Sequence, residues 1–416
     1  MARVLTSQMR VLVISQYYWP ESFRINDLTD ELVRRGHQVT VLTGAPNYPS
    51  GSLFSEYENE PEAYSSYKGV EIVRVPIVLR GQSEVQLALI YLSFIISGTI
   101  IGLFKLRKKR FDSIFVFEPS PITVGLPAIV FRYFKKAPIV FWVLDLWPDT
   151  LVAVGVFRSE SILKLVGWLV SYIYKRCDLI LGQSKSFISH IRKYAGHDRV
   201  AYFPGWAESV FSVDQFKSPN SRSGKAQFNV VFAGNVGVSQ DFPTVLKAME
   251  HLKENKNICW TIVGDGRMFD WLAAEIVNRG LENVVRLPGC YPMEDMPKFF
   301  QDADALLVNL KDDPIFSMTI PGKLQAYLVS GKPILALLNG EGARLVKDSG
   351  CGIACDAGDW QCLADSAQKL SQMSYQERDV MGRKGLLLSE TEFDRDKLIS
   401  KLENWMQDLA SGKKVY

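Results

Sequence analysis

The sequence predicts an α/β protein built from two doubly wound parallel sheets. Short, continuous apolar runs recur along the chain, which is typical of parallel strands covered on both faces. Helical segments separate these runs, and glycine-rich turns follow several of them, most clearly within Val230–Gln240 (VVFAGNVGVSQ). The alternation occurs in two halves without clear sequence repetition, so we expect two domains of similar architecture.

Length and composition exclude several classes of protein. The chain has 416 residues, of which 47 % are apolar, enough for two domains with substantial cores. A net charge of +3 is too small to indicate a nucleic-acid-binding protein. The six cysteines include no CxxC pair. We therefore expect reduced structural thiols in a reducing, cytosolic compartment rather than a zinc site.

The first domain opens with a βαβ unit. Arg10–Ser15 (RVLVIS) is an apolar strand, Asn26–Arg35 is an amphipathic helix that ends at Gly36, and Gln38–Thr43 is the second strand. The turn after the first strand is not GxGxxG, so a dinucleotide fingerprint is absent. The later strands of this domain are predicted at Val70–Val75, Ser113–Phe117, Ile139–Val143, Leu179–Gly182 and Val200–Phe203.

The second domain repeats the scheme after a weakly periodic stretch rich in serine, proline and glycine. We expect an N-terminal extension at residues 1–8, a first domain at 9–203, a linker at 204–226, a second domain at 227–390 and a last segment at 391–416, whose helix folds back across the domain junction. The strands of the second domain are predicted at Val230–Ala233, Trp260–Val263, Val284–Leu287, Ala305–Val308, Pro333–Leu337 and Gly352–Ala354.

Three points in the second domain predict a diphosphate-bearing ligand. A strand, the turn Gly234–Gly237 and a helix bring free backbone N–H groups and a helix N-terminus together, which suits a phosphate. Tight packing would also account for one such turn. Ile262–Gly266 (IVGDG) repeats the strand-to-glycine ending, and Thr319–Lys323 (TIPGK) places a lysine at the start of a helix.

Five motifs resemble those of a branch of family 4 glycosyltransferases, closest to the fucosamine transferases of bacterial O-antigen and capsule synthesis. They are YYWPESFRINDLTDELVRRGHQVTVLTGAPNYPSG, FWVLDLWPDTLVAVG, FAGNVGVSQDF, IVGDG and TIPGKLQAYLVSGKPI followed after five residues by GEGA. The resemblance implies the GT-B fold, in which two Rossmann-like domains face a central cleft. It also implies retaining transfer of a sugar, such as N-acetylfucosamine, from a UDP-sugar to a polyprenyl-diphosphate-linked acceptor.

The resemblance assigns a nucleotide-sugar site to the second domain. Lys323 and Arg267 would supply the cations that a buried diphosphate needs, and a surface position is the alternative for each. Glu341 would contact hydroxyls of the donor sugar or face solvent. The two glutamates common in family 4 are absent, because Met318 and Ala326 stand in their places. The donor-binding candidates are Gly234, Asn235, Gly237, Gln240, Arg267, Pro321, Gly322, Lys323 and Glu341.

Asp145 and Glu341 are the catalytic candidates. Asp145 follows a predicted strand, at the edge where such sheets place catalytic groups. It would orient the acceptor hydroxyl or stabilise positive charge on the donor sugar, whereas Asp149 fits a helix N-cap. The acceptor-side candidates in neighbouring loops are Glu21, Arg24 and Asn47, and a structural salt bridge is the alternative for Arg24.

No metal or other cofactor is expected. Asp302-Ala303-Asp304 matches the DxD motif that binds manganese in the other glycosyltransferase fold, but its position between a helical segment and a strand favours a helix end. Two further classes of function stay open. One is a sugar-nucleotide epimerase or phosphorylase on the same fold, and the other is a sugar-binding scaffold without turnover.

One segment predicts membrane association. Val85–Phe104 has no charged residue and is long enough to span a bilayer, but the strands on either side should share one sheet. A buried crossover helix is the alternative. The basic residues that follow favour a monotopic helix at 85–110 on the cytoplasmic face of the inner membrane. Small residues (Ser93, Ser97, Gly98, Gly102) would face the sheet, and the membrane contacts would be Leu89, Leu92, Ile96, Arg107, Lys108, Lys109 and Arg110, the last four on anionic lipid.

Overall fold

The computed structural model describes residues 8–48, 51–79, 84–153, 155, 159–212, 216 and 227–415. Two compact units form the chain, one of Met1–Phe203 with Asp396–Tyr416 and the other of Pro204–Arg395. Residues 1–7 of the predicted N-terminal extension lie outside the described residues, as do residues 213–215 and 217–226 of the predicted linker.

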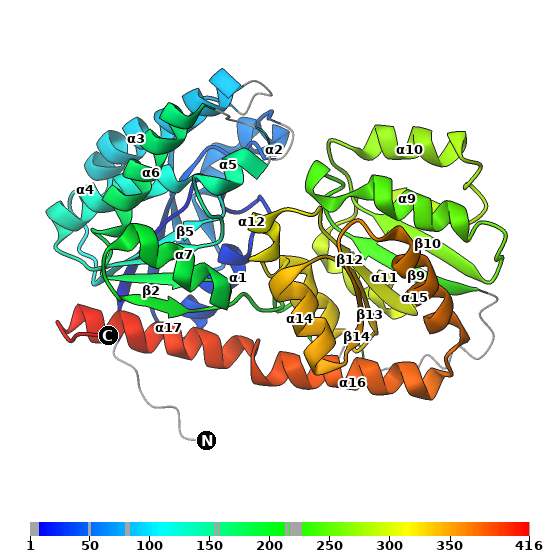
Figure 1. The fold of residues 1–416 in the computed structure, drawn as a ribbon. Helices are drawn as coiled ribbons and strands as arrows, with labels where there is room; N and C mark the ends of the chain where they lie inside the picture. The colour runs from blue at the N-terminus through cyan, green and yellow to red at the C-terminus, as the bar shows by residue number, and fades with distance from the viewer. Residues whose placement is uncertain are drawn as a thin grey trace. The chain divides into compact units, whose positions relative to one another are not determined.

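Unit 1 is built on an eight-stranded sheet in the order β3-β4-β2-β1-β5-β6-β7-β8 (Figure 1). All neighbours are parallel except β3 and β4. The strand order reverses between β1 and β5, which marks the edge of the sheet where ligands bind in this architecture. The strands are β1 (Arg10–Ile14), β2 (Gln38–Gly44), β3 (Ser66–Tyr67), β4 (Val70–Val75), β5 (Ser113–Glu118), β6 (Ile139–Val143), β7 (Leu179–Gly182) and β8 (Val200–Tyr202).

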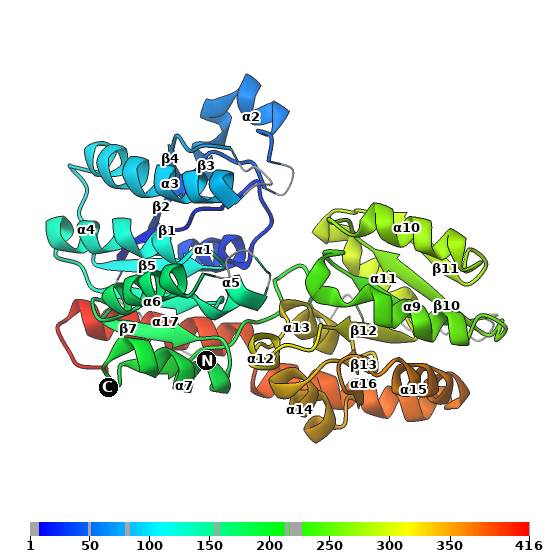
Figure 2. The same ribbon diagram turned by 45° about the horizontal axis from the view of Figure 1, so that its top comes forward.

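Helices cover this sheet (Figure 2), because strands buried on both faces need an apolar layer on each side. The helices of unit 1 are α1 (Arg24–Arg34), α2 (Ser55–Asn59), α3 (Glu84–Lys105), α4 (Gly125–Lys135), α5 (Asp149–Ala153), α6 (Glu160–Tyr174), α7 (Lys185–Ala195) and α17 (Arg395–Ala410), with short 3-10 turns at Pro61–Tyr64 and Ile122–Val124.

Unit 2 contains a six-stranded parallel sheet in the order β11-β10-β9-β12-β13-β14, with its reversal between β9 and β12. Its strands are β9 (Phe228–Ala233), β10 (Ile258–Val263), β11 (Val285–Gly289), β12 (Ala305–Asn309), β13 (Ile334–Leu337) and β14 (Gly352–Cys355). Its helices are α9 (Phe242–His251), α10 (Phe269–Asn278), α11 (Met296–Asp302), α12 (Pro314–Ser317), α13 (Gly322–Val329), α14 (Gly340–Ser349), α15 (Trp360–Gln372) and α16 (Tyr375–Thr391), with 3-10 turns at Val238–Gln240 and Met293–Asp295.

The predicted fold class of two doubly wound α/β domains is confirmed. Every predicted strand is present, and most of them are apolar runs that the sheet buries, whereas the edge strand β11 is largely exposed. The sequence interpretation missed α2 and β3. These elements have five and two residues, too few to show a period.

The prediction that all cysteines are reduced is wrong for one pair. Cys355 ends β14, and Cys362 lies in the first turn of α15, where its backbone N–H donates to the capping Asp359. This tight turn brings the two Cα atoms to 5.7 Å, and the cysteines form a disulfide. Cys177, Cys259 and Cys351 are buried free thiols, and Cys290 is an exposed one.

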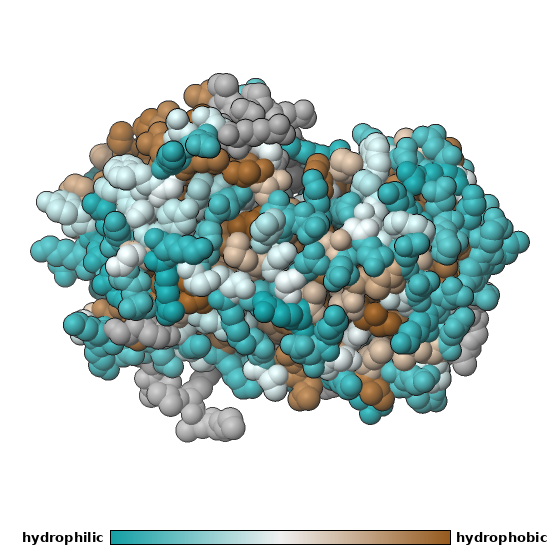
Figure 3. Space-filling view, viewed as in Figure 1, coloured by the Kyte–Doolittle hydropathy of each residue, from teal (hydrophilic) through white to brown (hydrophobic). Residues whose placement is uncertain are grey.

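α3 has one packed face and one exposed face. A Cβ atom at Gly98 would lie 3.5 Å from Pro127, and one at Gly102 would lie 3.1 Å from Leu42. These contacts and the burial of Ser97 confirm the predicted packing face. The opposite stripe is 45–65 % exposed and consists of Leu89, Leu92, Ile96, Ile100 and Phe104. In Figure 3, brown residues gather on unit 1 over α3.

Two neighbouring helices extend the exposed apolar surface. α4 packs on both α3 and α6. Large apolar side chains that are 41–79 % exposed lie at the end of α4 and along α6, namely Tyr133, Phe134, Ile162, Leu165 and Trp168. Among the described residues, α3 is the one helix long and apolar enough to cross a membrane, with a mean hydropathy of 1.8 over Ala88–Lys105 and 28 % burial. It connects β4 and β5 of the same sheet.

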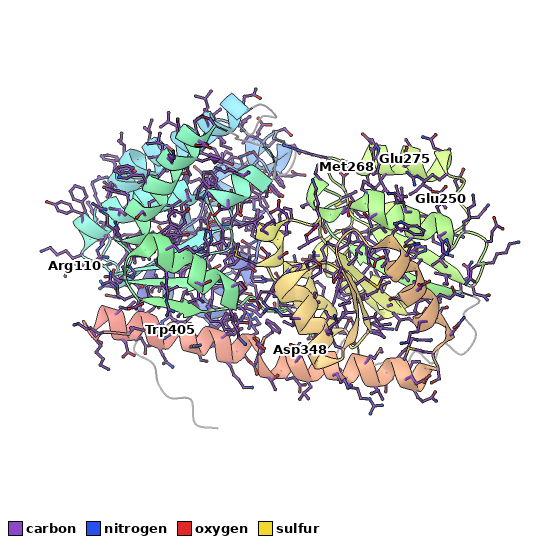
Figure 4. The ribbon with its side chains drawn as sticks, viewed as in Figure 1. Arg110, Glu250, Met268, Glu275, Asp348 and Trp405 are labelled. Atoms are coloured by element: carbon purple, nitrogen blue, oxygen red, sulfur yellow. A yellow bond between two sulfur atoms is a disulfide. The ribbon has the colours of Figure 1, made fainter. Side chains whose placement is uncertain are left out.

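A buried polar network anchors α17 to the start of unit 1. His37 accepts the backbone N–H of Met9 at Nδ1 (3.1 Å), so its proton is on Nε2, 2.7 Å from Oε1 of Glu403. Arg35 donates to the other carboxylate oxygen of Glu403. Nearby, the ring of Trp405, labelled in Figure 4, packs edge-to-face on Phe203. The last helix is therefore part of the core of unit 1.

Replacing Glu403 by Gln should destabilise unit 1 by about 1.5–3 kcal/mol, the range for a hydrogen bond to a charged group. Burial acts to raise the pKa of Glu403, but hydrogen bonds from His37 and Arg35 outweigh it and lower the pKa. The stabilisation is therefore present above the unfolded pKa and is lost as the pH falls through the folded value. Urea unfolding of the full chain at pH 7 and at pH 3–4 measures this.

Asp408→Asn is the matched control, because Asp408 is on the same helix in an exposed ion pair with Lys413. It should cost less than about 1 kcal/mol. Equal losses for the two variants at pH 7 would contradict an anchoring role for Glu403.

Candidate functional site

The glycine-rich loops of unit 2 pack directly on one another. A Cβ atom at Gly264 would lie 2.0 Å from the carbonyl oxygen of Gly234, and one at Gly266 would lie 2.4 Å from Oδ1 of Asn235. Both glycines also have positive φ angles of 137° and 155°. Backbone hydrogen bonds from Gly234 to Val263 (2.9 Å) and from Val236 to Asp265 join the loops. The IVGDG motif thus fixes the turn after β9.

Lys323 places an enclosed ammonium group beside this turn. It lies in the first turn of α13, and its Nζ donates to Oε1 of Gln240 (2.7 Å) and lies 3.7 Å from the ring centroid of Phe232. The lysine also fills the space beside Gly234, whose Cβ atom would lie 3.3 Å from Nζ. Within the described part of the chain, no carboxylate forms a salt bridge with it. Burial lowers the pKa of Lys323 well below its usual value.

Two side chains hold the surroundings of Lys323 in place. The hydroxyl of Tyr327 accepts the backbone N–H of Ala233 (2.8 Å) and donates to its carbonyl oxygen, which fixes the end of β9. Asn309, fully buried at the end of β12, donates to the backbone oxygen of Gln240. Its Oδ1 atom is buried without a described partner. Because the edge is rigid and one cation lacks a counter-ion, it suits an anion.

The other donor-binding candidates occupy the same edge of the sheet or its loops. Pro321 and Gly322 begin α13, and Gly237 lies under the side-chain amide of Asn235. Arg267 is exposed in the loop after β10. Glu341, in the first turn of α14, is largely buried and 3.2 Å from Arg344. The carboxylate of Glu341 therefore does not simply face solvent, and a contact with the donor sugar would have to share it with Arg344.

The positions of the two absent glutamates lie in the same region. Met318 follows α12, and Ala326 is a buried residue of α13, one turn after Gly322. The DxD candidate is structural, because Asp304 accepts the backbone N–H of Asn229 (2.9 Å) and Asp302 ends α11. Among the described residues, no group of three His, Cys, Asp or Glu side chains is arranged to hold a metal.

In unit 1, Glu21 and Asn47 hold loops together. The buried carboxylate of Glu21 accepts backbone N–H groups from Tyr18, Asn47 and Tyr48 at 2.8–3.1 Å, which joins the loop after β1 to the loop after β2. Burial raises the pKa of Glu21, and these three N–H groups oppose the shift. Asn47 is itself fully buried. Arg24 is half-buried at the start of α1.

Asp145 lies in the loop after β6, two residues beyond Val143, which pairs with Glu118 at the end of β5. The indole N–H of Trp147 lies 3.3 Å from Oδ2 of Asp145 and 3.3 Å from Oγ of Ser120. Burial raises the pKa of Asp145, while hydrogen bonds from Thr150, Trp147 and Ser120 lower it.

Glu118 is a residue that the sequence interpretation missed. Its side chain is fully buried, and neither carboxyl oxygen has a described hydrogen-bond partner. The backbone N–H groups of Leu144 and Asp145 are nearby and act to lower its pKa. Burial and the charge of Asp145 outweigh them and raise that pKa well above its usual value. Glu118 and Asp145 are thus neighbouring carboxyl groups whose pKa values are both raised, chiefly by burial.

A histidine was also missed. His190 on α7 places Nε2 2.9 Å from Oδ2 of Asp149, but the two groups are not aligned as a hydrogen bond. Burial lowers the pKa of His190, and Asp149 opposes the shift. No spacing in the sequence links these residues, because α5 and α7 bring them together.

Comparisons with known proteins identify both halves of the chain. A model of the family "Glycosyl transferase 4-like domain" matches residues 22–206, and a model of "Glycosyl transferases group 1" matches residues 214–386. The probable glycosyltransferase WbjE of Pseudomonas aeruginosa is 25 % identical over 69 % of this chain and 72 % of its own. The putative colanic acid biosynthesis glycosyl transferase WcaI of Escherichia coli K12 is 23 % identical over 78 % and 82 %.

Solved structures share the fold. HepE of Anabaena in complex with UDP-glucose is 15 % identical, with a TM-score of 0.67, over 97 % of this chain and 100 % of that structure. WaaG, a glycosyltransferase involved in lipopolysaccharide biosynthesis, has a TM-score of 0.66 at 16 % identity, over 97 % and 100 %. Sucrose-phosphate synthase of Thermosynechococcus elongatus has a TM-score of 0.75 at 12 % identity, over 98 % and 100 %.

Proposed function

We propose that this chain transfers a sugar from a UDP-sugar to a polyprenyl-diphosphate-linked acceptor. The chain belongs to the group 1 glycosyltransferases and is a GT-B enzyme. The product would enter a surface polysaccharide such as an O-antigen or capsule. The relatives named above support this setting, and HepE is a structural neighbour that binds UDP-glucose. We further propose an N-acetylated amino-deoxyhexose as the transferred sugar, with retention at its anomeric carbon.

The enclosed ammonium of Lys323 carries the donor proposal. A partly buried cation that lacks a described carboxylate partner is costly unless a ligand supplies the negative charge. The backbone of Gly234 lies next to the lysine side chain, and the N-terminus of α13 adds a favourable field. These groups would stabilise the leaving diphosphate as its negative charge increases. The exposed side chain of Arg267 would contribute a second cation. We therefore propose transfer without a metal.

Asp145 is the proposed catalytic group of unit 1. As the less deeply buried member of the pair with Glu118, it would orient the acceptor hydroxyl or stabilise positive charge on the sugar. Trp147 and Ser120 fix its position. The transferred atoms balance simply. The bond from the anomeric carbon to the UDP oxygen breaks, the bond to the acceptor oxygen forms, and the acceptor proton leaves with UDP or solvent.

The exposed face of α3 supports a peripheral place on the inner membrane. Its stripe is exposed, its ends join strands of one sheet, and Tyr133 and Trp168 add aromatic side chains to the same face of unit 1. Of the predicted basic contacts, Lys109 pairs with Glu71, whereas Arg107, Lys108 and Arg110 are exposed. We propose that α3 lies in the lipid interface, with these three cations on anionic headgroups.

Lys323→Ala should weaken UDP binding by about 1.5–3 kcal/mol, because a charge-assisted hydrogen bond to phosphate is lost. This corresponds to roughly a tenfold to 150-fold higher Kd by calorimetry. Lys347→Ala is the control, since Lys347 is an exposed lysine of α14. Equal UDP affinities for wild type and Lys323→Ala would show that Lys323 does not meet the diphosphate.

Transfer of radiolabel from a UDP-sugar panel to lipid diphosphate acceptors tests the reaction itself. Asp145→Asn nearly preserves shape and removes the charge, so kcat should fall roughly 10²-fold or more while the Kd for UDP is unchanged. Transfer by the wild type should survive excess EDTA. An Asp145→Asn enzyme with full kcat would make Asp145 structural, and EDTA-sensitive transfer restored by manganese would contradict metal independence.

Flotation with vesicles tests the location. Wild type should float with anionic vesicles, and Arg107, Lys108 and Arg110 changed together to Glu should lose roughly 3 kcal/mol of binding, about 1 kcal/mol for each basic residue. Lys247, Lys253 and Lys256, exposed on unit 2, changed to Glu give a control of equal charge. If both triple variants float like wild type, or if wild type does not float, α3 is not a lipid contact.

A further inference from the structure

An aliphatic groove runs beside α3. One wall is the chain segment after β4, with Pro76, Ile77 and Val78, and the other wall is one side of α3. The groove has a volume of about 570 Å³ and is lined by Pro76, Ile77, Val78, Ser93, Ile96, Ser97, Ile100 and Ile101. Ile77 is wedged against the end of β2, where a Cβ atom at Gly44 would lie 2.6 Å from its Cδ1. The wall is therefore fixed rather than loose.

The chemistry of the lining suits hydrocarbon. No charged or aromatic side chain is among the eight lining residues. The hydroxyl of Ser93 is satisfied within the walls, since it donates to the carbonyl of Ile90 (2.8 Å) and accepts the N–H of Val78 (2.9 Å). Ser97 contributes a buried Oγ without a described partner. A sugar, nucleotide or peptide backbone would leave its polar groups unpaired here.

The groove borders the exposed stripe of α3. Tyr91 lies on the opposite side of the helix, where it packs edge-to-face on Trp147 (5.9 Å), whose indole contacts Asp145. At the other side, Ile96 and Ile100 belong both to the groove and to the exposed stripe of α3. The cations Arg107, Lys108 and Arg110 follow at the end of the helix. The groove thus opens on the surface proposed for lipid, with these cations beyond one end of it.

We propose that this groove holds the first part of the hydrocarbon chain of the lipid-linked acceptor. This inference rests on the proposed function and adds a subsite to it. The enzyme would then select lipid-linked over soluble acceptors by the chain as well as by the sugar. A buried chain contributes binding in proportion to its length. A second protein is disfavoured, because the hydroxyl of Ser97 is the one lining side-chain group, among the described residues, left to pair with its polar atoms.

The probe is farnesyl diphosphate carrying a benzophenone on its chain, used with the full-length protein without detergent. After irradiation, mass spectrometry should find labelled peptides from residues 76–78 and 93–101. Unlabelled farnesyl diphosphate should compete at least tenfold better than isopentenyl diphosphate, which has the same head and a shorter chain. Dihexanoyl phosphatidylglycerol, a bulk phospholipid mimic, should compete weakly.

Two variants separate the groove from the stripe. Ser97→Leu fills the groove and should reduce labelling at least tenfold, with UDP affinity unchanged because Ser97 is in unit 1. Leu92→Ser removes a stripe side chain that does not line the groove, and should leave labelling within twofold. Ser97→Leu is checked by circular dichroism, and the wild-type competition series tests the proposal without it.

Three results would overturn the subsite. They are labelling outside residues 76–78 and 93–101, equal competition by isopentenyl and farnesyl diphosphate, and competition by the phospholipid mimic as strong as that by farnesyl diphosphate, which would mark a site for bulk lipid. The outcome of the radiolabel transfer assay does not depend on the outcome of the photolabelling. Transfer to chain-free and chain-bearing acceptors at equal kcat/KM refutes the groove alone, whereas no transfer to any acceptor refutes the proposed function.

Discussion

The contact between the backbones of Gly234 and Gly264 is the constraint on which the candidate site of unit 2 depends. With a carbonyl oxygen 2.0 Å from where a Cβ atom would be, the loop after β10 can carry no side chain at that point. The loops therefore close on each other, and the space left beside Gly234 is filled by Lys323. The ring of Phe232 and the amide of Gln240 lie against its ammonium group, which is the arrangement on which the proposed anion site rests. Tight packing and anion binding, which are alternatives for this turn at the sequence level, would then depend on the same glycines.

The sequence is sufficient for most of the fold and for part of the site. Apolar runs define strands such as β6, and turn chemistry finds Gly234 and Lys323, because both depend on neighbours along the chain. Glu118 could not be found in this way. Glu118 lies beside Asp145 only because β5 pairs with β6. The local sequence FEPSP around this glutamate does not indicate that pairing. The Cys355–Cys362 disulfide likewise depends on the tight turn between β14 and α15.

The candidate residues of unit 1 fall into two kinds: those that hold the loops together and those whose side chains are available for chemistry. Glu21 and Asn47 spend their polar groups on backbone partners, so they shape the edge of the sheet. Burial raises the pKa of both Asp145 and its neighbour Glu118, and Glu118 is the more deeply buried of the two carboxyl groups. The same edge carries Trp147 and, through Tyr91, the start of α3. The helix proposed for lipid and the loop proposed for chemistry are therefore in direct contact within one unit.

The anchoring of α17 has a consequence for biosynthesis. The carboxylate that satisfies His37 and Arg35 belongs to Glu403, close to the end of a 416-residue chain. A ribosome delivers that residue only after all of unit 2 has been made. The usual order, in which the N-terminal domain is finished first, is therefore reversed here. Unit 2 is one continuous segment and can complete its core first. In unit 1, the surface formed by β1, β2 and α1 stays uncovered until α17 has left the ribosome.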